Sequence, residues 1–251
     1  MNPELSIAAT AVICAVGFGV GIFGAVLGST LFVLVPLLSA FGMPIHSAIG
    51  TAKVSVVGRE MAPLAYFRSR GLVNLRSGLV LTITAVAAAQ AGALCATWVN
   101  AAALERIVGL CMLLMAGATL LNADAGLSPS KPLPGGGMVK NAFAGILIGF
   151  YTGIFGGGAN VLIVFALVYI SGETFLGAVA NSKLPNLVIT AASLPVFVAA
   201  GYVDWMVAVP LTLATAAGAA LGARLAVNRE NRTLRIVFRV LIVVLAIHYL
   251  F

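Results

Sequence analysis

Two lysines stand inside long apolar segments of this 251-residue chain, where a cation is costly. Lys53 ends the stretch 48–53 and Lys183 ends the similar stretch 178–183, so the two lysines lie 130 residues apart. A lysine at the centre of a membrane helix costs roughly 2.5–3.5 kcal/mol on insertion scales. One such lysine could pair with an acid and hold helices together, but two at equivalent positions are harder to explain in that way. We therefore favour a binding site for an anion over purely structural ion pairs.

Counter-charges are scarce at the depth of these lysines. Glu60 is the one acid well inside a predicted helix, and it follows Lys53 by seven residues, on the same helix face and about 10 Å further along the axis. At least one lysine therefore lacks an obvious protein partner, and a bound anion is the simplest counter-charge. We interpret Glu60 mainly as half of a structural ion pair, and alternatively as a proton carrier. Since adjacent helical residues point about 100° apart, we do not expect Arg59 and Glu60 to face one cavity together.

The composition is that of a polytopic membrane protein. Hydrophobic residues make up 61% of the chain and charged residues 8%, whereas a soluble domain carries about 25% charged residues. The long apolar runs do not alternate with polar residues, so they predict membrane helices and not the strands of a barrel. The net charge of +7 comes from basic residues beside these runs, which fits orientation in a membrane better than nucleic-acid binding. The predicted fold class is all-α.

The second half of the chain repeats the first. Pairs that keep the 130-residue offset include Gly42 and Gly172, Gly71 and Gly201, Val73 and Val203, and Gly92 and Gly222. We predict a first membrane repeat over residues 1–121, a cytoplasmic linker rich in Gly, Pro and Ser over 122–138, and a second membrane repeat over 139–251. Each repeat is expected to hold a Gly-interrupted helical hairpin and three transmembrane helices. The expected helical segments are 5–22, 26–41, 44–68, 77–98, 104–121, 139–155, 159–171, 174–200, 205–227 and 233–250.

The basic residues predict opposite orientations for the two repeats. Arg68, Arg70 and Arg76 surround the loop after the third helix, and the positive-inside rule places this loop in the cytoplasm. The equivalent loop, 201–205, then lies outside, so the repeats are inverted and both termini are periplasmic in an inner membrane. Each lysine lies nine residues into its helix, about 14 Å into a hydrocarbon core roughly 30 Å thick. Both lysines thus approach the midplane from opposite faces, as in the central sites of many secondary transporters.

Glycine-rich joints interrupt both hairpins, at residues 21–28 and 153–160. Close helix packing is one explanation, and an interrupted hairpin whose N–H groups face an anion is the other. Pro185 likewise predicts either a packed kink or a locally unwound polar segment beside Lys183. The candidate substrate-binding residues are Lys53, Lys183, Thr51, Asn181, Ser182, Asn160, Gly157, Gly158, Thr30 and Ser29, with Glu60 for possible proton coupling.

An ordered set of short motifs covers nearly the whole chain. In the first half these are the Gly-rich joint, Pro36 and residues 48–53 and 66–74; in the second half they are residues 149–156, 178–183 and 222–225. Together they resemble the TauE/SafE family of membrane transporters, the sulfite exporter family, and the lysine-bearing version is similar to one subgroup of it. This resemblance implies transport of sulfite, sulfonates or related organic anions, without fixing the substrate or the direction.

We therefore expect a secondary transporter that moves a small anion of the sulfite or sulfonate type by alternating access. An anion channel or a transporter of non-sulfur carboxylates would use the same residues. A membrane enzyme would need an intramembrane His, Asp or Cys cluster with catalytic spacing, which the sequence lacks, so no enzymatic activity is expected. Cys14, Cys95 and Cys111 stand singly, so we expect no disulfide, metal or cofactor. The expected partners are the small anion and the lipid bilayer, and the sequence does not determine the oligomeric state.

Overall fold

The all-helical prediction is confirmed. A computed structural model describes residues 7–27, 30–74, 76, 78–104, 106–107, 110 and 137–227. The helices are α1 (Ile7–Leu27), α2 (Leu31–Ala40), α3 (Ile45–Ser69), α4 (Leu79–Trp98), α6 (Gly137–Ile154), α7 (Ala159–Tyr169), α8 (Phe175–Ala199) and α9 (Trp205–Val227). Most of the predicted helix 104–121, the linker up to residue 136 and the predicted helix 233–250 lie outside the described residues.

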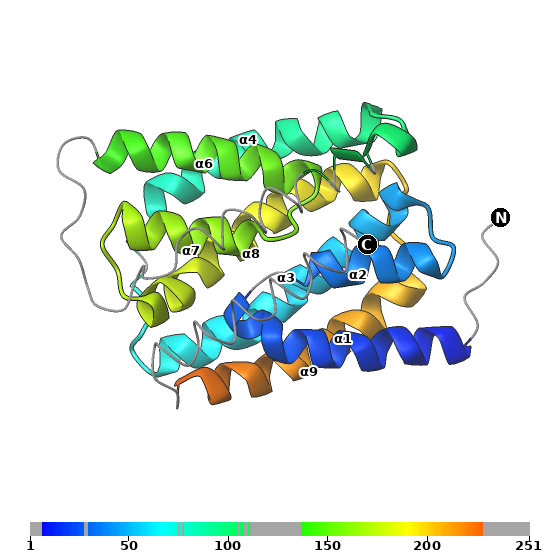
Figure 1. The fold of residues 1–251 in the computed structure, drawn as a ribbon, viewed down its shortest axis with the longest axis horizontal. Coiled ribbons are helices and arrows are strands. Elements are labelled where there is room, and N and C mark those ends of the chain that lie inside the picture. The colour runs from blue at the N-terminus through cyan, green and yellow to red at the C-terminus, as the bar shows by residue number, and fades with distance from the viewer. Residues whose placement is uncertain are drawn as a thin grey trace.

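The two halves of the chain pack against each other in a reciprocal pattern. α4 of the first half packs on α6 and α8 of the second, while α9 of the second half packs on α1 and α3 of the first. α3 and α8 pack on each other at the centre, between the α4–α6 pair and the α1–α9 pair (Figure 1). Exchanging α1–α4 with α6–α9 leaves this set of contacts unchanged, as a pseudo-two-fold axis between the halves would require.

α3 and α8, each 25 residues long, begin and end at equivalent positions. Pro44 precedes α3, and Thr174 precedes α8, where its side chain accepts a hydrogen bond from the N–H of Gly177 (3.2 Å). Both helices stop just before a glycine with positive φ, Gly71 at +68° and Gly201 at +73°. Because other L-residues rarely adopt this conformation, these glycines end both helices.

The two central helices run antiparallel. The N–H of Asn74, after α3, donates to Oδ1 of Asn181 near the start of α8 (2.7 Å). The N–H of Asp204, after α8, donates to Oγ1 of Thr51 near the start of α3 (3.0 Å). These two bonds are equivalent, since each residue of one lies 130 positions from its counterpart in the other. They connect opposite ends of α3 and α8 and so help to fix the register between them.

Glycine lets the outer helices approach the other half closely. A Cβ atom on Gly92 of α4 would collide with the carbonyl oxygen of Phe150 in α6, and one on Gly222 of α9 would collide with the carbonyl oxygen of Ile22 in α1. Small residues are typical of helix contacts in membranes, where association depends on tight packing. The α4–α6 and α1–α9 contacts thus use glycine at equivalent positions.

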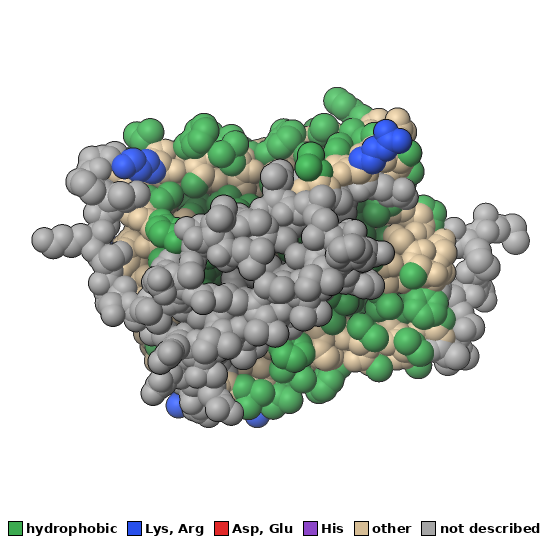
Figure 2. All heavy atoms as spheres, in the orientation of Figure 1, with side chains coloured by type: hydrophobic (Ala, Val, Ile, Leu, Met, Phe, Trp, Pro, Cys, Tyr) green, Lys and Arg blue, Asp and Glu red, His purple; other side chains and the backbone are tan. Residues whose placement is uncertain are grey.

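Four of the described helices are long and apolar enough to cross a membrane: α4, α6, α8 and the segment Trp205–Leu225 of α9. Their outer faces expose large hydrophobic side chains, among them Trp98 and Met206, which are 82% and 85% exposed. Hydrophobic side chains line the outer edges of the view in Figure 2, and the visible Lys and Arg side chains lie at its margins. The protein is therefore a polytopic integral membrane protein.

The first joint is shorter than predicted. α1 stays helical to Leu27, whereas the prediction ended this helix at residue 22. Gly21 and Gly24 make room for neighbours inside the helix, because a Cβ on Gly21 would collide with the backbone of Thr215 and one on Gly24 would collide with Arg59. Helix packing, one of the two explanations left open, accounts for both glycines.

Of the two alternatives left open for Pro185, the locally unwound segment is not present. α8 continues without interruption from Phe175 to Ala199, with Pro185 inside it. A proline removes only one helical N–H donor, and tightly packed membrane helices tolerate this loss. Lys183 is therefore carried on a regular helix.

Candidate functional site

Four charged side chains are buried where α3 meets α8. Lys53, Arg59 and Glu60 come from α3 and Lys183 comes from α8, and each is at most 1% exposed. Burial of charged groups is expensive unless they are paired or hydrogen-bonded. The hydrogen bonds and ion pairs of each side chain therefore show which of the four charges the protein compensates.

Lys53 is fully satisfied by the protein. Its Nζ donates to the carbonyl oxygens of Thr152 and Gly153 (both 2.7 Å) and to Oγ of Ser193 (3.0 Å). It also lies 4.6 Å from the centroid of the Phe197 ring. An ammonium group has three N–H donors, so these bonds use all of them. The two carbonyls belong to the C-terminal end of α6, where the helix dipole favours a cation.

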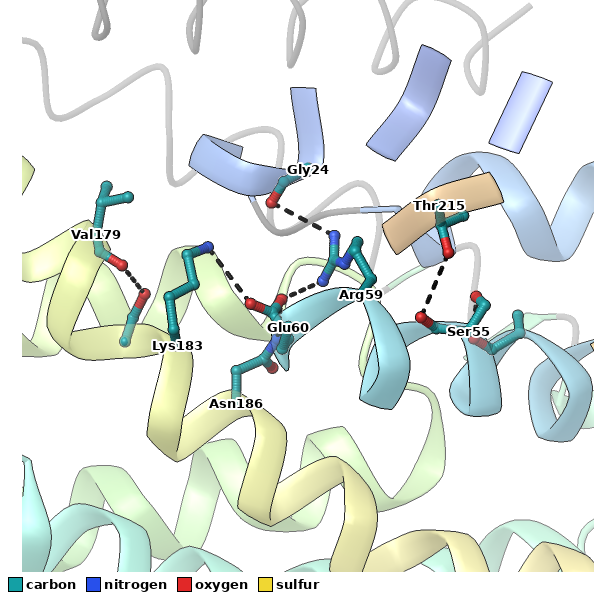
Figure 3. Close-up of polar contacts among 10 residues, drawn as sticks. Gly24, Ser55, Arg59, Glu60, Val179, Lys183, Asn186 and Thr215 are labelled. Carbon is teal, nitrogen blue, oxygen red and sulfur yellow. Dashed lines mark hydrogen bonds and ion pairs between the residues drawn. The ribbon is translucent and has the colours of Figure 1, made fainter. Parts of the chain in front are cut away.

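Lys183 has different surroundings, although it is the counterpart of Lys53. Its Nζ lies 3.6 Å from Oε2 of Glu60 and makes no hydrogen bond to any described residue, although the side chain is 0% exposed. Figure 3 shows the Lys183 side chain directed from α8 toward the Glu60 carboxylate on α3. The ammonium therefore has a nearby negative charge and unused hydrogen-bonding capacity.

The Glu60 carboxylate joins two cations. Its Oε1 accepts hydrogen bonds from Nη2 of Arg59 and from Nδ2 of Asn186 (2.9 Å), whereas its Oε2 has no hydrogen-bond partner among the described residues. Nη1 of Arg59 reaches the carbonyl oxygen of Gly24 in α1 (3.4 Å). Arg59 and Glu60 form an ion pair although adjacent helical residues point about 100° apart, because the long arginine side chain folds back to its neighbour. Glu60 also faces Lys183 across the helix contact, and not Lys53 along its own helix.

The two lysines reach different levels of the α3–α8 contact. Lys53 reaches Ser193, whereas Lys183 reaches Glu60, which lies seven residues beyond Lys53 on α3. Seven residues of helix span about 10 Å, more than the head group of a small anion. In this conformation the two ammonium groups belong to separate clusters, and joint binding of one anion by both lysines stays a prediction.

The buried charges do not cancel. In the described part of the chain three cations and one carboxylate are buried, a net charge of +2. The carbonyls of α6 offset the charge of Lys53, but Arg59, Glu60 and Lys183 together keep a net charge of +1. Within the described residues the two other acids, Glu173 and Asp204, directly precede α8 and α9 and so lie away from this cluster.

The second glycine-rich joint matches its prediction and holds an unusual side chain. α6 ends at Ile154 and α7 begins at Ala159, with Gly156 and Gly158 between them at φ +83° and +74°. Asn160, in the first turn of α7, is 0% exposed, and neither atom of its side-chain amide has a hydrogen-bond partner among the described residues. Burial without a partner costs free energy, because the amide loses its hydrogen bonds to water and gains none from protein. The Asn160 amide can therefore still donate and accept hydrogen bonds at this joint.

The first joint offers the equivalent feature directly before α2. Thr30, 130 residues before Asn160, is 1% exposed, and its Oγ1 has no hydrogen-bond partner among the described residues. Thr30 lies close to the charged cluster, because a Cβ on Gly24 would touch both Thr30 and Arg59. The two joints meet each other: a Cβ on Gly156 would lie 3.4 Å from Leu31 at the start of α2. Ser29 lies outside the described residues.

Other predicted site residues are engaged in structural bonds. Thr51 and Asn181 accept the cross-helix bonds described above, and Nδ2 of Asn181 also donates to Oε2 of Glu173 (2.7 Å). The Ser182 hydroxyl donates to the carbonyl oxygen of Val179 within α8 (2.9 Å). The carbonyl oxygen of Gly157 accepts a hydrogen bond from the Tyr151 hydroxyl. Their binding of substrate stays a prediction.

Some members of the two clusters were absent from the predicted site. Asn186 and Arg59 contact Glu60, and Ser193 contacts Lys53. The duplication could have predicted these contacts. Inverted halves place α3 and α8 side by side and antiparallel, so residue 60 lies near residue 186 and residue 53 lies near residue 193.

A polar cavity of about 390 Å³ lies at the ends of α4 and α8. Asn74, Arg76, Asn141, Ser171 and Glu173 contribute its polar lining. Glu173 of this lining accepts a hydrogen bond from Asn181 of α8, which lies two residues before Lys183.

Nearly the whole chain matches a known family. The family described as sulfite exporter TauE/SafE matches residues 13–249. A probable membrane transporter protein of Sinorhizobium sp, ORF9, is 29% identical over 93% of this chain and 89% of its own length. A probable membrane transporter protein of Haemophilus influenzae is 25% identical over 92% of this chain and 91% of its own length. The probable membrane transporter protein YfcA of Escherichia coli K12 is 26% identical over 86% and 80% of the two chains.

No solved structure matches the chain. The family match spans both halves and includes both lysine-bearing helices. The relatives, described as probable membrane transporter proteins, match this chain over most of their own length. The resemblance seen in the sequence motifs is thereby confirmed, and the chain belongs to the sulfite exporter TauE/SafE family of membrane transporters.

Proposed function

We propose that this protein is a secondary transporter that moves a small sulfur-containing or organic anion, of the sulfite or sulfonate type, across the inner membrane. One observation carries the proposal: the buried cluster of Lys183, Arg59 and Glu60 has a net charge of +1 and leaves the Lys183 ammonium without a hydrogen bond to any described residue. A small anion would supply both the missing charge and the missing acceptors.

Other groups around the two joints would complete the site. Thr30, directly before α2, and Asn160, in the first turn of α7, have buried side-chain atoms without a hydrogen-bond partner among the described residues. The N-terminal end of a helix carries a partial positive charge and favours an anion. In this proposal Lys183 attracts the anion, Thr30 and Asn160 orient it, and Lys53 holds α3 against the end of α6.

Alternating access follows from the way the site is shared between the halves. Arg59 and Glu60 belong to the first half, and Lys183 and Asn186 belong to the second. Rocking one half against the other would change the distance between these groups and open the site to one side at a time. The 390 Å³ cavity beside Asn181 would be the entrance on the cytoplasmic side.

The proposed orientation has the loop at residues 68–76 in the cytoplasm and both termini in the periplasm. It is supported by the antiparallel packing of the equivalent helices α3 and α8, which halves of inverted orientation would produce. A membrane-impermeant thiol reagent added from the periplasm should label a cysteine at Asp204 and leave one at Ser69 unlabelled, each in a background without native cysteines. Equal labelling of both positions would contradict the inverted arrangement.

Transport itself is tested with purified protein in proteoliposomes. The panel is sulfite, thiosulfate, taurine, isethionate, sulfoacetate, acetate and malonate, each scored for binding and for uptake. A secondary transporter should show saturable uptake and counterflow of at least one of these anions, and the Lys183→Met variant should show neither. Unsaturable current without counterflow would instead identify an anion channel. Absence of binding and flux for every anion would contradict the proposal.

Coupling to protons is a separate part of the proposal, with Glu60 as the carrier. Glu60 faces Lys183, Arg59 and Asn186, so an anion that binds to Lys183 would alter the free energy of ionising Glu60. The Glu60→Gln variant should lose uptake driven by a pH gradient while it keeps exchange of one anion for another. Uptake driven by the pH gradient at the wild-type rate in Glu60→Gln would assign coupling to another group.

A further inference from the structure

We infer that Glu60 fills one of two anionic positions in this site and thereby restricts the substrate to a single negative charge. The inference rests on the proposed anion transport and adds the charge class of the ligand. The favoured ligand has a monovalent head group, such as a sulfonate or a monocarboxylate, and divalent anions are disfavoured.

Glu60 is placed between the two cations. Its Oε1 is bonded to Arg59 and Asn186, which leaves the Arg59 charge paired. Its Oε2 lies 3.6 Å from Nζ of Lys183 and makes no hydrogen bond to a described residue. The carboxylate therefore compensates one of the two positive charges, while the ammonium of Lys183 can still donate hydrogen bonds to a second anionic group.

The charge count then sets the valence. Lys183 and Arg59 against Glu60 leave a net charge of +1, which one monovalent anion cancels. A divalent anion would leave one negative charge buried without a partner, and such a charge is strongly unfavourable at low dielectric. Lys53 cannot supply the missing positive charge, because its three donors are occupied at a level about 10 Å away along α3.

No further cation of the described chain is buried near the cluster. The other described basic residues are all exposed: Arg68, Arg70, Arg76, Arg106, Lys140 and Arg224. Among the described residues, only the charges of Glu60, Arg59 and Lys183 thus determine which ligand charge is favoured at Lys183.

The test is a series of variants that changes the net charge of the cluster in single steps. Arg59→Met lowers it to zero, Glu60→Gln raises it to +2, and the double variant Arg59→Met/Glu60→Gln restores +1. Binding is measured for two matched pairs of probes, isethionate against sulfoacetate and acetate against malonate, whose members carry one and two negative charges at neutral pH. Asp204→Asn is the control, because it removes a carboxylate outside the cluster and keeps the side-chain oxygen that accepts from the N–H groups of Met206 and Val207.

The wild-type protein and the Asp204→Asn control should prefer the monovalent member of a pair by about tenfold or more. Glu60→Gln should reverse that preference, and the double variant should return it to the wild-type value. Arg59→Met should weaken binding of both members by about tenfold or more, and it keeps the test decisive if Glu60→Gln does not fold.

Two other results would overturn the inference. The first is a monovalent-to-divalent ratio that stays the same across the whole series while the wild-type protein still binds anions; the proposed transport would survive that result. The second is a wild-type protein that binds no member of either pair, which would remove the proposed function together with the inference.

Discussion

Lys53 and Lys183 occupy equivalent positions in the repeated halves, yet only one of them is satisfied. The ammonium of Lys53 donates three hydrogen bonds, two to carbonyls of α6 and one to Ser193. Lys183 makes no hydrogen bond to a described residue and depends on the Glu60 charge 3.6 Å away. The duplication preserves the helix, the depth and the cation, but the neighbours decide whether that cation is structural or available to a ligand.

Two substitutions between the halves contribute to the difference. Ser193, the hydroxyl that binds Lys53, corresponds to Pro63 in the first half, and proline offers no side-chain acceptor to Lys183. Glu60, the carboxylate beside Lys183, corresponds to Thr190 in the second half, which carries no charge. Each lysine therefore meets a partner that its counterpart cannot have, and of these two lysines Lys183 is the one without a hydrogen bond to a described residue.

Removal of Lys53 should lower stability more than removal of Lys183, whereas removal of Lys183 should weaken anion binding more than removal of Lys53. Lys53→Met leaves two buried carbonyls and a hydroxyl without their donor, so it should lower the free energy of unfolding by about 2–4 kcal/mol. Lys183→Met removes an incompletely paired buried cation while Glu60 keeps Arg59, so the free energy of unfolding should change by less than about 1 kcal/mol. Reversible unfolding in detergent or mixed micelles measures both, and a larger loss in Lys183→Met would contradict the comparison.

The sequence allowed good prediction of the elements that carry these lysines. The bounds of α3, α8 and α9 agree with the predicted segments to within two residues, because Pro44, Gly71 and Gly201 mark helix ends by their backbone chemistry. The apolar pattern and the 130-residue offset also placed Lys53 and Lys183 on equivalent helices.

The partners of the lysines could not be predicted in the same way. The residue pattern of a single helix does not show how α3 and α8 are aligned against each other. That antiparallel alignment brings Glu60 to Lys183 and Ser193 to Lys53. The two alternatives for Pro185 and Gly24 could not be decided from the sequence for a related reason: whether a helix breaks depends on packing against neighbouring helices, and those contacts are not visible in the segment itself.

The α4–α6 and α1–α9 contacts should contribute equally to stability, whereas the two lysine clusters differ. Gly92→Ala and Gly222→Ala each place a Cβ against a backbone carbonyl of the other half, so each should lower the free energy of unfolding by about 1–3 kcal/mol. The same measurement on Gly19→Ala is the control, because no neighbouring atom lies within 4 Å of that position. A loss confined to one of the two variants would show that the halves do not pack equivalently.

The smallest effect is expected at the cross-helix bonds. Thr51→Val removes the acceptor of the Asp204 N–H and should lower the free energy of unfolding by about 1 kcal/mol. Since the Thr51 side chain is occupied by this bond, anion affinity in the variant should stay within about threefold of wild type. An affinity loss of about tenfold or more would return Thr51 to the binding site.

In the proposed site Lys183, and not Lys53, binds the anion. Equilibrium binding of isethionate and acetate should be measured on Lys183→Met and Lys53→Met side by side, with the folded fraction of each sample determined by gel filtration. Lys183→Met should lose about 100-fold or more in affinity, equivalent to roughly 2.7 kcal/mol, while folded Lys53→Met should stay within about threefold of wild type. Equal losses in the two folded variants, or a larger loss in Lys53→Met, would contradict the assignment.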